Sequence, residues 1–232
     1  MDGDEKQLIL EKAKIWFRET VVANHIANTL KLKKLSQFNV NPFLKKYLAN
    51  YLTGNSSPES IARALIYPRV LGQSITTSFG QNMQSFASDV LSGWGSTTAG
   101  IDIEFNDCSD GQKKYCQLKA GPNTINKDDV ESIAGHFKAV LNLSRVNNLR
   151  IPNDDLIVGV IYGTQSELSG HYRRLESQYR YPVYAGADFW TRLTGDAQFY
   201  VDLADAIGSV AEEADCREQL DEVVSALAEQ LN

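Results

Sequence analysis

The chain has 232 residues, 43% of them hydrophobic and 22% charged, which is an ordinary composition for a globular protein. It carries 23 Lys and Arg against 29 Asp and Glu, a formal net charge of −6. No apolar run approaches the roughly 20 residues that cross a bilayer, and the polar start Met-Asp-Gly-Asp-Glu-Lys is unlike a signal peptide. We therefore expect a cytoplasmic protein. Its three cysteines lack the spacing of a metal site and are expected to be free thiols: Cys108, Cys116 and Cys216.

The first third of the chain is predicted to be helical. Between residues 5 and 35, apolar side chains recur at the spacing of two amphipathic helices. Two more helices follow, and the second begins at Pro58 behind Ser57 as its N-cap and stops before Pro68. Residues 1–70 are therefore predicted to form a helical N-terminal subdomain.

The remainder is predicted to alternate between helices and strands. In order, the predicted elements are a helix over 78–91, a β-hairpin over 100–119, a helix over 127–142 behind the N-cap Asn126, a strand over 155–162, a polar helix over 166–179, a short strand over 182–186, and helices over 188–193 and 199–231, the last with a break near Gly208. The strand over 155–162 is nearly all apolar, which favours the centre of a sheet. We predict an α/β (α+β) fold with a central mixed sheet flanked by helices, its core in 71–195 and acidic C-terminal helices, 196–232, packed on that core.

Charge is unevenly distributed along the chain. Residues 1–70 hold eleven basic and six acidic side chains, whereas residues 151–232 hold five and fifteen. Ten of those acids follow Gly195, so residues 1–195 hold 22 basic against 19 acidic side chains. The acidic helices are free to face away from a nucleic acid while the rest supplies a positive field. Net charge therefore does not exclude a nucleic-acid partner.

Four polar side chains of the predicted hairpin are spaced to lie together. Asp102 and Glu104 alternate on its first strand, so they share one face; Gln117 and Lys119 do the same on the second. Pairing the two strands would bring carboxylate, amide oxygen and ammonium groups to one edge. This grouping suits a divalent cation and a scissile phosphate. An ordinary strand-end aspartate and a solvated edge lysine would give the same pattern.

The hairpin and its surroundings resemble the PD-(D/E)xK nuclease superfamily. Gly100-Ile101-Asp102 stands where that family has Pro-Asp, and Gln117-Leu118-Lys119 where it has (Asp/Glu)-x-Lys. The segment from Lys119 to Asn126 and the chain size look most like a type II restriction endonuclease. The resemblance covers about residues 78–187. It implies a restriction-endonuclease-like core and Mg²⁺-dependent hydrolysis of double-stranded DNA at a short specific sequence.

The same resemblance implies roles for the site residues. Asp102 would be the first metal ligand, and Lys119 would orient the attacking water or stabilise charge on the phosphate. Gln117 would be a neutral ligand in place of the family's second carboxylate. The missing charge would come from Glu104 or from Glu131, and one Mg²⁺ is expected. The family's glutamate on the preceding helix is matched here by Gln84, again neutral.

Further polar residues suit contacts with phosphates or base edges, although ordinary surface structure explains them equally well. They are Asn123, Thr124, Asn126 and Lys127 after the second hairpin strand, and Arg173 and Arg174 in the helix over 166–179. His136 lies in an apolar helix and is predicted to pack in the core.

The resemblance also implies partners. We expect a homodimer on a short palindromic duplex, because twofold DNA symmetry is matched most simply by twofold protein symmetry. A cognate DNA methyltransferase would act on the same site without stable binding. Two alternatives stay open: a structure-specific DNA repair nuclease or resolvase of the same fold, and a non-catalytic DNA-binding protein that has lost its second carboxylate.

Overall fold

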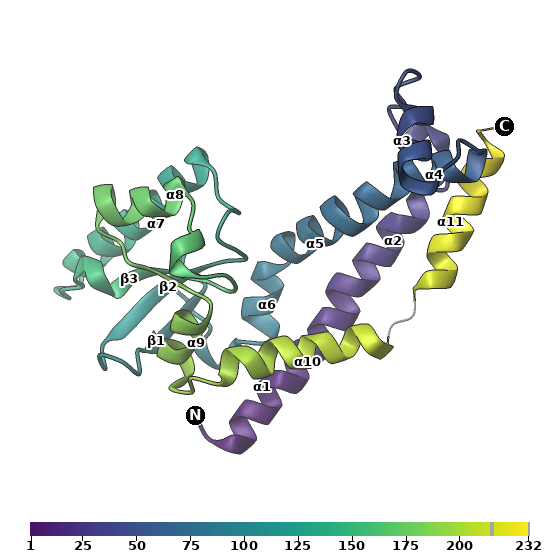
Figure 1. Ribbon diagram of the computed structural model, residues 1–232. Helices are drawn as coiled ribbons and strands as arrows, with labels where there is room; N and C mark the ends of the chain where they lie inside the picture. Colours follow the sequence, from purple (N-terminus) through teal and green to yellow (C-terminus); the bar gives the residue numbers. More distant parts are fainter. Residues whose placement is uncertain (214–215, 232) are drawn as a thin grey trace. The chain divides into compact units, whose positions relative to one another are not determined.

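The computed structural model describes residues 1–213 and 216–231. The chain divides into two compact units, which we describe separately (Figure 1). The sheet unit comprises Met1–Trp16 with Gly80–Gly208, and the helical unit comprises Phe17–Phe79 with the segment from Ser209 onward. The predicted boundaries at residues 70 and 195 divide the chain differently, since the first predicted helix and the start of the C-terminal segment both belong to the sheet unit.

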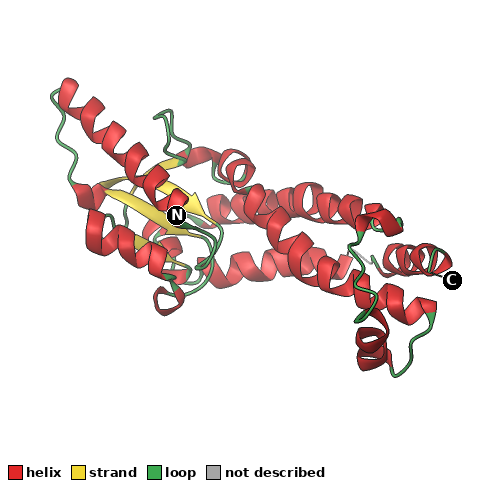
Figure 2. Cartoon of the chain, turned by 90° about the horizontal axis from the view of Figure 1, so that it is seen from above, coloured by secondary structure: helices red, strands yellow, loops and turns green. Residues whose placement is uncertain are grey.

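The sheet unit is built on a four-stranded mixed sheet in the order β1-β2-β3-β4 (Figure 2). Its strands are β1 (Ile103–Asn106), β2 (Lys113–Lys119), β3 (Leu156–Val160) and β4 (Val183–Ala185). The hairpin strands β1 and β2 pair antiparallel, whereas β2 with β3 and β3 with β4 pair parallel. Helices flank this sheet, so the predicted α/β fold class is confirmed.

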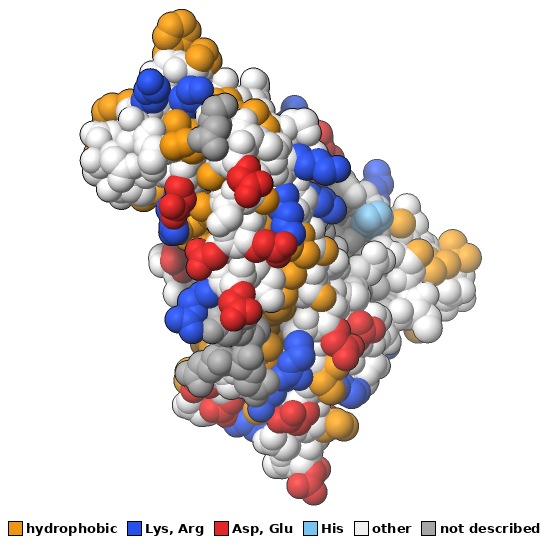
Figure 3. Space-filling view, turned by 90° about the vertical axis from the view of Figure 1, so that its right-hand side faces the viewer, with side chains coloured by type: hydrophobic (Ala, Val, Ile, Leu, Met, Phe, Trp, Pro, Cys, Tyr) orange, Lys and Arg blue, Asp and Glu red, His pale blue; other side chains and the backbone are white. Residues whose placement is uncertain are grey.

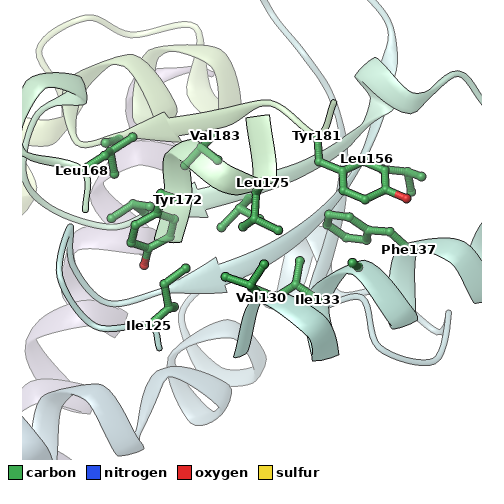
Figure 4. Close-up of a cluster of buried hydrophobic side chains, with 14 of the residues drawn as sticks. Ile125, Val130, Ile133, Phe137, Leu156, Leu168, Tyr172, Leu175, Tyr181 and Val183 are labelled. Atoms are coloured by element: carbon green, nitrogen blue, oxygen red, sulfur yellow. The ribbon is translucent and has the colours of Figure 1, made fainter. Parts of the chain in front are cut away.

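Helices cover both faces of the sheet. The helices of this unit are α1 (Gly3–Trp16), α6 (Met83–Asp89), α7 (Lys127–Val146), α8 (Gly170–Arg174), α9 (Ala187–Thr194) and the start of α10 (Phe199–Glu213). Helices α7 and α8 contribute Val130, Phe137 and Tyr172 to a buried cluster that also holds Leu156 and Val158 of β3 (Figure 4). The alternate residues of β3 face the other way, so this strand is apolar on both faces and fully buried.

The opposite face of the sheet packs on α9. Gly159 of β3 is needed there, because a Cβ atom would lie 2.4 Å from the Phe189 ring. Phe189 also meets Phe105 of β1 edge to face, with ring centroids 6.5 Å apart. Since Phe105 lies on the α9 face, the neighbouring residue Glu104 points to the α7 face.

The helical unit consists of helices and short helical turns. Its α-helices are α2 (Ala23–Lys31), α3 (Lys45–Thr53), α4 (Pro58–Pro68), most of α5 (Ile75–Gln81) and α11 (Arg217–Glu229), with π-helices at Phe17–Val22 and Arg69–Ser74 and a 3-10 turn at Leu35–Gln37. The predicted start of α4 is confirmed: the Ser57 side chain accepts a hydrogen bond from the Ser60 N–H at 3.2 Å, and Pro58 follows the cap.

Helix α11 packs on α4 and α2 within the helical unit. Its buried side chains Val223, Val224 and Leu227 join Ile66 and Leu32 in one apolar cluster. The sequence predicts that the C-terminal helices pack on the core formed by 71–195; α10 starts in the sheet unit, whereas α11 belongs to the helical unit. The apolar stripe of α11 and its acidic flank fit the basic α2–α4 region, where Lys33 Nζ lies 2.6 Å from Glu222.

Three predicted helix ends need correction. The helix expected to stop before Pro68 includes Pro68 as its last residue and continues into the π-helix Arg69–Ser74. Gly208 does not break the C-terminal segment, because α10 continues through it to Glu213. A glycine inside a helix costs only about 1 kcal/mol relative to alanine, which tertiary packing easily offsets. The helix predicted over 199–231 also crosses residues 214–215, which lie outside the described residues. The helix predicted over 166–179 begins only at Gly170 and ends as the π-helix Leu175–Tyr179.

Across residues 1–213 and 216–231, no helix combines the length and the apolar character needed to cross a membrane.

Candidate active site

The polar residues of the hairpin meet at the C-terminal end of β2. Ile103 pairs with Cys116, and this register continued by one residue sets Asp102 opposite Gln117. Because alternate residues share a face, Asp102, Gln117 and Lys119 all lie on the face of the sheet that α7 covers. The structure therefore brings these three predicted site residues together.

Asp102 is a half-buried carboxylate with one oxygen open. Its Oδ2 accepts a hydrogen bond from the Leu118 N–H at 2.7 Å, and its Oδ1 accepts none from the described residues. Burial raises the pKa of Asp102 above its ordinary value, although the Leu118 N–H and the Lys119 charge act in the opposite direction. A carboxylate removed from water with a free oxygen is stabilised by a bound cation.

Gln117 is buried, with 7% of its surface exposed. Its Nε2 donates to the Gly100 carbonyl and lies 2.7 Å from His136 Nδ1. Within the described chain, no group donates a hydrogen bond to its Oε1. The amide nitrogen is thus held by protein groups, and the amide oxygen is the end available to a ligand.

Lys119 is the last residue of β2 and stands between two carboxylates. Its Nζ lies 4.0 Å from Asp129 Oδ1, and its charge acts on Asp102. The Lys119 side chain is 28% exposed, so its ammonium group can reach an incoming phosphate. Asp129 was not among the predicted site residues. The Asn126-x-x-Asp129 spacing of a capping box was the available signal, since it fixes Asp129 where α7 begins, close to the end of β2.

Glu104 is held by three protein groups. Its Oε1 accepts hydrogen bonds from Ser96 Oγ at 2.5 Å and Thr98 Oγ1 at 2.8 Å, and its Oε2 lies 2.7 Å from Lys113 Nζ. Burial acts against its charged form, but these three donors together lower the pKa of Glu104 below its ordinary value. Ser96, Thr98 and Lys113 together hold both carboxylate oxygens, so Glu104 has a structural role.

An open pocket of about 700 Å³ lies beside Glu104 and Lys113, also lined by Trp94. Neither Asp102 nor Lys119 lines it. The pocket therefore lies apart from the group of polar residues at the end of β2.

The other two residues expected near the metal, Glu131 and Gln84, are both exposed. Glu131 of α7 is exposed and accepts hydrogen bonds from Arg174 at 2.6 Å and from the Tyr179 hydroxyl at 2.9 Å. The Tyr179 and Arg174 hydrogen bonds lower the pKa of Glu131. Gln84 is exposed on α6, and its side chain makes no hydrogen bond within the described residues. The α7 carboxylate that approaches Lys119 is Asp129.

The predicted DNA contacts separate into two groups. Three residues stabilise the protein itself: Asn126 caps α7, Thr124 holds the turn at Gly121, and Arg174 pairs with Glu131. The side chains of Asn123 and Lys127 are exposed and make no hydrogen bond within the described part of the chain. Arg173 is also exposed, but its guanidinium donates a hydrogen bond to the Ser166 carbonyl at 3.3 Å.

His136 is not the core histidine that the apolar helix pattern predicted. It is exposed on α7 and turned toward the hairpin, where its ring contacts Gly100 and Gln117. The buried positions of α7 are its neighbours Ile133, Phe137 and Val140. Helical periodicity correctly marks the buried stripe, but His136 lies at its border and faces the polar site.

A mixed sheet flanked by helices, with Asp102 before β1 and Gln117-Leu118-Lys119 at the end of β2, is consistent with a PD-(D/E)xK nuclease in which glutamine replaces the second carboxylate. The model of the type II restriction endonuclease EcoO109I family matches residues 7–215 of the chain. The chain therefore belongs to this family. It is a site-specific deoxyribonuclease that acts on double-stranded DNA, which confirms the predicted class and enzyme type. No curated protein matches the chain.

Proposed function

We propose that this enzyme uses Mg²⁺ to hydrolyse phosphodiester bonds at a short specific DNA sequence, with Asp102, Gln117 and Lys119 as its catalytic centre. The observation that carries the proposal is the half-buried Asp102, whose Oδ1 accepts no hydrogen bond from the described residues, on the same face of the sheet as Gln117 and Lys119. Carboxylates whose pKa is shifted by burial and by nearby charges are typical of functional sites.

The donor set fits Mg²⁺. Among residues 1–213 and 216–231, no three His, Cys, Asp or Glu side chains gather into a metal-binding group. A cage made wholly of protein ligands is therefore not built here. Mg²⁺ is usually bound by one or two carboxylates together with waters and substrate phosphate oxygens, so Asp102 Oδ1 and Gln117 Oε1 suffice as protein ligands.

Each residue then has a definite task. Asp102 Oδ1 and Gln117 Oε1 would hold the cation, which supplies Lewis acidity and a more acidic bound water. The Leu118 N–H fixes the Asp102 carboxylate. Lys119 would stabilise charge that develops on the phosphate or orient the attacking water. Asp129 would hold the Lys119 ammonium near the site before DNA arrives.

We further propose that the enzyme acts as a homodimer on a palindromic site, each subunit cutting one strand, and that a cognate methyltransferase modifies the same site without stable binding. Asn123 and Lys127 are our first candidates for DNA contacts, because both are exposed, lie near the end of β2 and make no side-chain hydrogen bond within residues 1–213 and 216–231. Arg173 follows. Thr124, Asn126 and Arg174 would contact DNA only in addition to their structural roles.

Incubation of long duplex DNA with the enzyme and Mg²⁺ tests the proposal. Discrete bands are expected, and Asp102→Ala and Lys119→Ala should each reduce cleavage by about 100-fold or more. Asp205→Ala and Lys138→Ala are matched controls, since both side chains are exposed and neither is among the proposed site residues, and they should cut like the parent. Cleavage that resists EDTA, or Asp102→Ala cutting at the parent rate, would refute the proposed mechanism.

The same digest tests sequence recognition and the catalytic centre separately. A smear or branch-dependent cutting would contradict cleavage at a specific sequence. Duplex binding without cleavage in Mg²⁺, Mn²⁺ or Ca²⁺ would contradict the proposed catalytic role of Asp102, Gln117 and Lys119.

A further inference from the structure

A cluster of three groups connects the site to α7: the Gln117 amide, the Gly100 carbonyl and the His136 imidazole. An amide nitrogen has two N–H donors, and two acceptors face it here, the Gly100 oxygen and His136 Nδ1 at 2.7 Å. Both donors of Gln117 are thereby used. Its oxygen is left without a protein donor among the described residues.

This arrangement matters because an amide is not symmetrical. A carboxylate presents an oxygen to a cation whichever way it turns, but an amide turned by half a revolution presents an NH₂ group. The chain has glutamine where its family has a second carboxylate. A site that relies on the amide oxygen therefore needs a device that fixes the amide's orientation.

The backbone conformation at Gly100 is also suited to close contact between Gly100 and the His136 ring. Gly100 has φ +79°, and a Cβ atom at this position would lie 2.7 Å from His136 Cγ. Only glycine therefore lets the Gly100 carbonyl and the His136 ring meet the same amide. Asp129 and His136 are seven residues apart on one side of α7, so a single helix face serves both Lys119 and Gln117.

We propose that His136 is a positioning residue which, with the Gly100 carbonyl, holds the Gln117 amide with its oxygen toward the divalent cation. The inference rests on the proposed function, in which Gln117 Oε1 is a metal ligand. It requires the neutral tautomer of His136 that accepts at Nδ1 and carries its proton on Nε2. Because the ring is exposed, removing it opens no cavity in the core, so metal affinity should fall while the fold persists.

Paired substitutions test the role of His136. His136→Ala removes the acceptor and should weaken Mn²⁺ binding to the DNA-free protein, followed by electron paramagnetic resonance, by about tenfold, with a matching rise in the Mg²⁺ needed for half-maximal cleavage. His136→Asn places an oxygen near the former Nδ1 and should stay within about threefold of the parent, whereas His136→Gln, whose oxygen matches Nε2, should behave like alanine.

Repeating His136→Ala in the Gln117→Glu variant separates the effect of the Gln117 amide orientation from the effect of lost packing. In Gln117→Glu the side chain presents an oxygen in either orientation, so adding His136→Ala should change Mn²⁺ affinity by less than about threefold. Nitrogen NMR of the parent should show Nδ1 of His136 without a proton. A protonated Nδ1, or an equal loss from His136→Ala in both backgrounds, would overturn the inference.

Failure of the inference and failure of the proposed function give different results. If Asp102→Ala loses Mn²⁺ binding and cleavage while His136→Ala matches the parent, the positioning role is refuted and the proposed function stands. If Asp102→Ala itself binds Mn²⁺ and cuts like the parent, the proposed function is refuted, and the role of His136 with it.

Discussion

Asp102 and Glu104 show how two carboxylates of one strand face acquire different properties. Asp102 loses water and gains one backbone hydrogen bond, so its pKa rises through burial. Glu104 also loses water, but Lys113, Ser96 and Thr98 lower its pKa. The charge of Glu104 is balanced inside the protein, and that of Asp102 is only partly balanced. The position that most needs a cation is therefore Asp102.

We predict that Glu104→Gln keeps cleavage within about threefold of the parent but changes the pH dependence of stability. The folded-state pKa of Glu104 is lowered, so its stabilisation is full above the unfolded value near 4.5 and is lost as pH falls through the folded-state pKa. Thermal unfolding from pH 7 to 3 should show the parent losing more stability than the variant.

The control for this prediction is Glu229→Gln, an exposed carboxylate of α11 that makes no hydrogen bond or ion pair among the described residues, which should follow the parent curve. A loss of cleavage in Glu104→Gln as large as that of Asp102→Ala would instead make Glu104 a metal ligand.

At the residue scale, sequence alone predicted that Asp102, Gln117 and Lys119 would gather, because two-residue spacing on paired strands fixes a common face. It could not predict the partners of Glu104, since Ser96 and Thr98 come from the irregular segment before β1. The hydrogen bonds that Glu131 accepts from Arg174 and Tyr179 likewise could not be predicted, because they depend on how α7 packs against the segment that carries these two residues.

At the scale of single elements, α7 carries much of the site's geometry. Its N-terminus is fixed by a capping box, in which Asn126 Oδ1 accepts from the N–H groups of Asp128 and Asp129, and Asp129 Oδ2 accepts from the Asn126 N–H. The same Asp129 side chain approaches Lys119 through its other oxygen. Loss of the cap would therefore destabilise the first turn of α7 and leave Asp129 less firmly fixed beside Lys119.

We predict that Asn126→Ala lowers the free energy of unfolding by about 1 kcal/mol, because the first N–H groups of α7 lose their acceptor. Asn126→Asp retains the cap and should keep the parent's stability. Urea unfolding of the three proteins measures this difference.

DNA binding by the same variants distinguishes the two roles considered for Asn126. If it is chiefly a cap, Asn126→Asp binds DNA nearly as well as the parent. If Asn126→Asp binds DNA much more weakly at unchanged stability, Asn126 contacts a phosphate or base directly, because the DNA phosphates repel the carboxylate introduced at that position.

Elements with strong local signals were predicted correctly, namely the helix start at Ser57, the cap at Asn126 and the apolar strand β3. The π-helices were not, because each is about one turn within a longer helical segment and is too short to leave a pattern of its own in the sequence. The helix expected over 166–179 shows the limit: Thr164 and Glu167 form a capping box on a short 3-10 turn, and the α-helix begins only at Gly170.

At the scale of the whole molecule, the basic N-terminal and acidic C-terminal parts of the sequence meet within each unit. In the sheet unit, Lys6 pairs with Asp196 at 2.6 Å and also with Asp202. In the helical unit, Lys33 pairs with Glu222 at 2.6 Å. On the face in Figure 3, acidic and basic side chains lie intermixed. The expected positive field of the N-terminal third is thus partly neutralised inside the protein.

The sequence could not predict which helices α11 packs against, because an apolar stripe with an acidic flank fits many surfaces.

We predict that Leu227→Ala lowers the free energy of unfolding by about 2–5 kcal/mol, since Leu227 is fully buried against α4 and α2. Leu143→Ala on α7 is the matched control, being a helical leucine that is 57% exposed, and should change stability little. Equal effects of the two changes in urea unfolding would contradict the packing of α11.

Charge pairing also determines which lysines can contribute to DNA affinity. A lysine that neutralises a phosphate releases a counterion, so removing it reduces the salt slope of log Kd by about 0.9. Lys127 is exposed and makes no hydrogen bond among the described residues, whereas Lys33 is held by Glu222. We therefore predict that Lys127→Ala lowers the slope by about one, and that Lys33→Ala leaves it unchanged.

Fluorescence anisotropy of a labelled duplex in Ca²⁺, across a series of salt concentrations, measures both slopes without cleavage. Lys138→Ala, another exposed lysine of α7 further along the helix, shows whether any α7 charge has the same effect. A reduced slope for Lys33→Ala with an unchanged slope for Lys127→Ala would place the phosphate contacts on the basic N-terminal segment. In that case the ion pair with Glu222 must break when DNA binds, and Glu222→Gln should strengthen binding because it frees Lys33 beforehand.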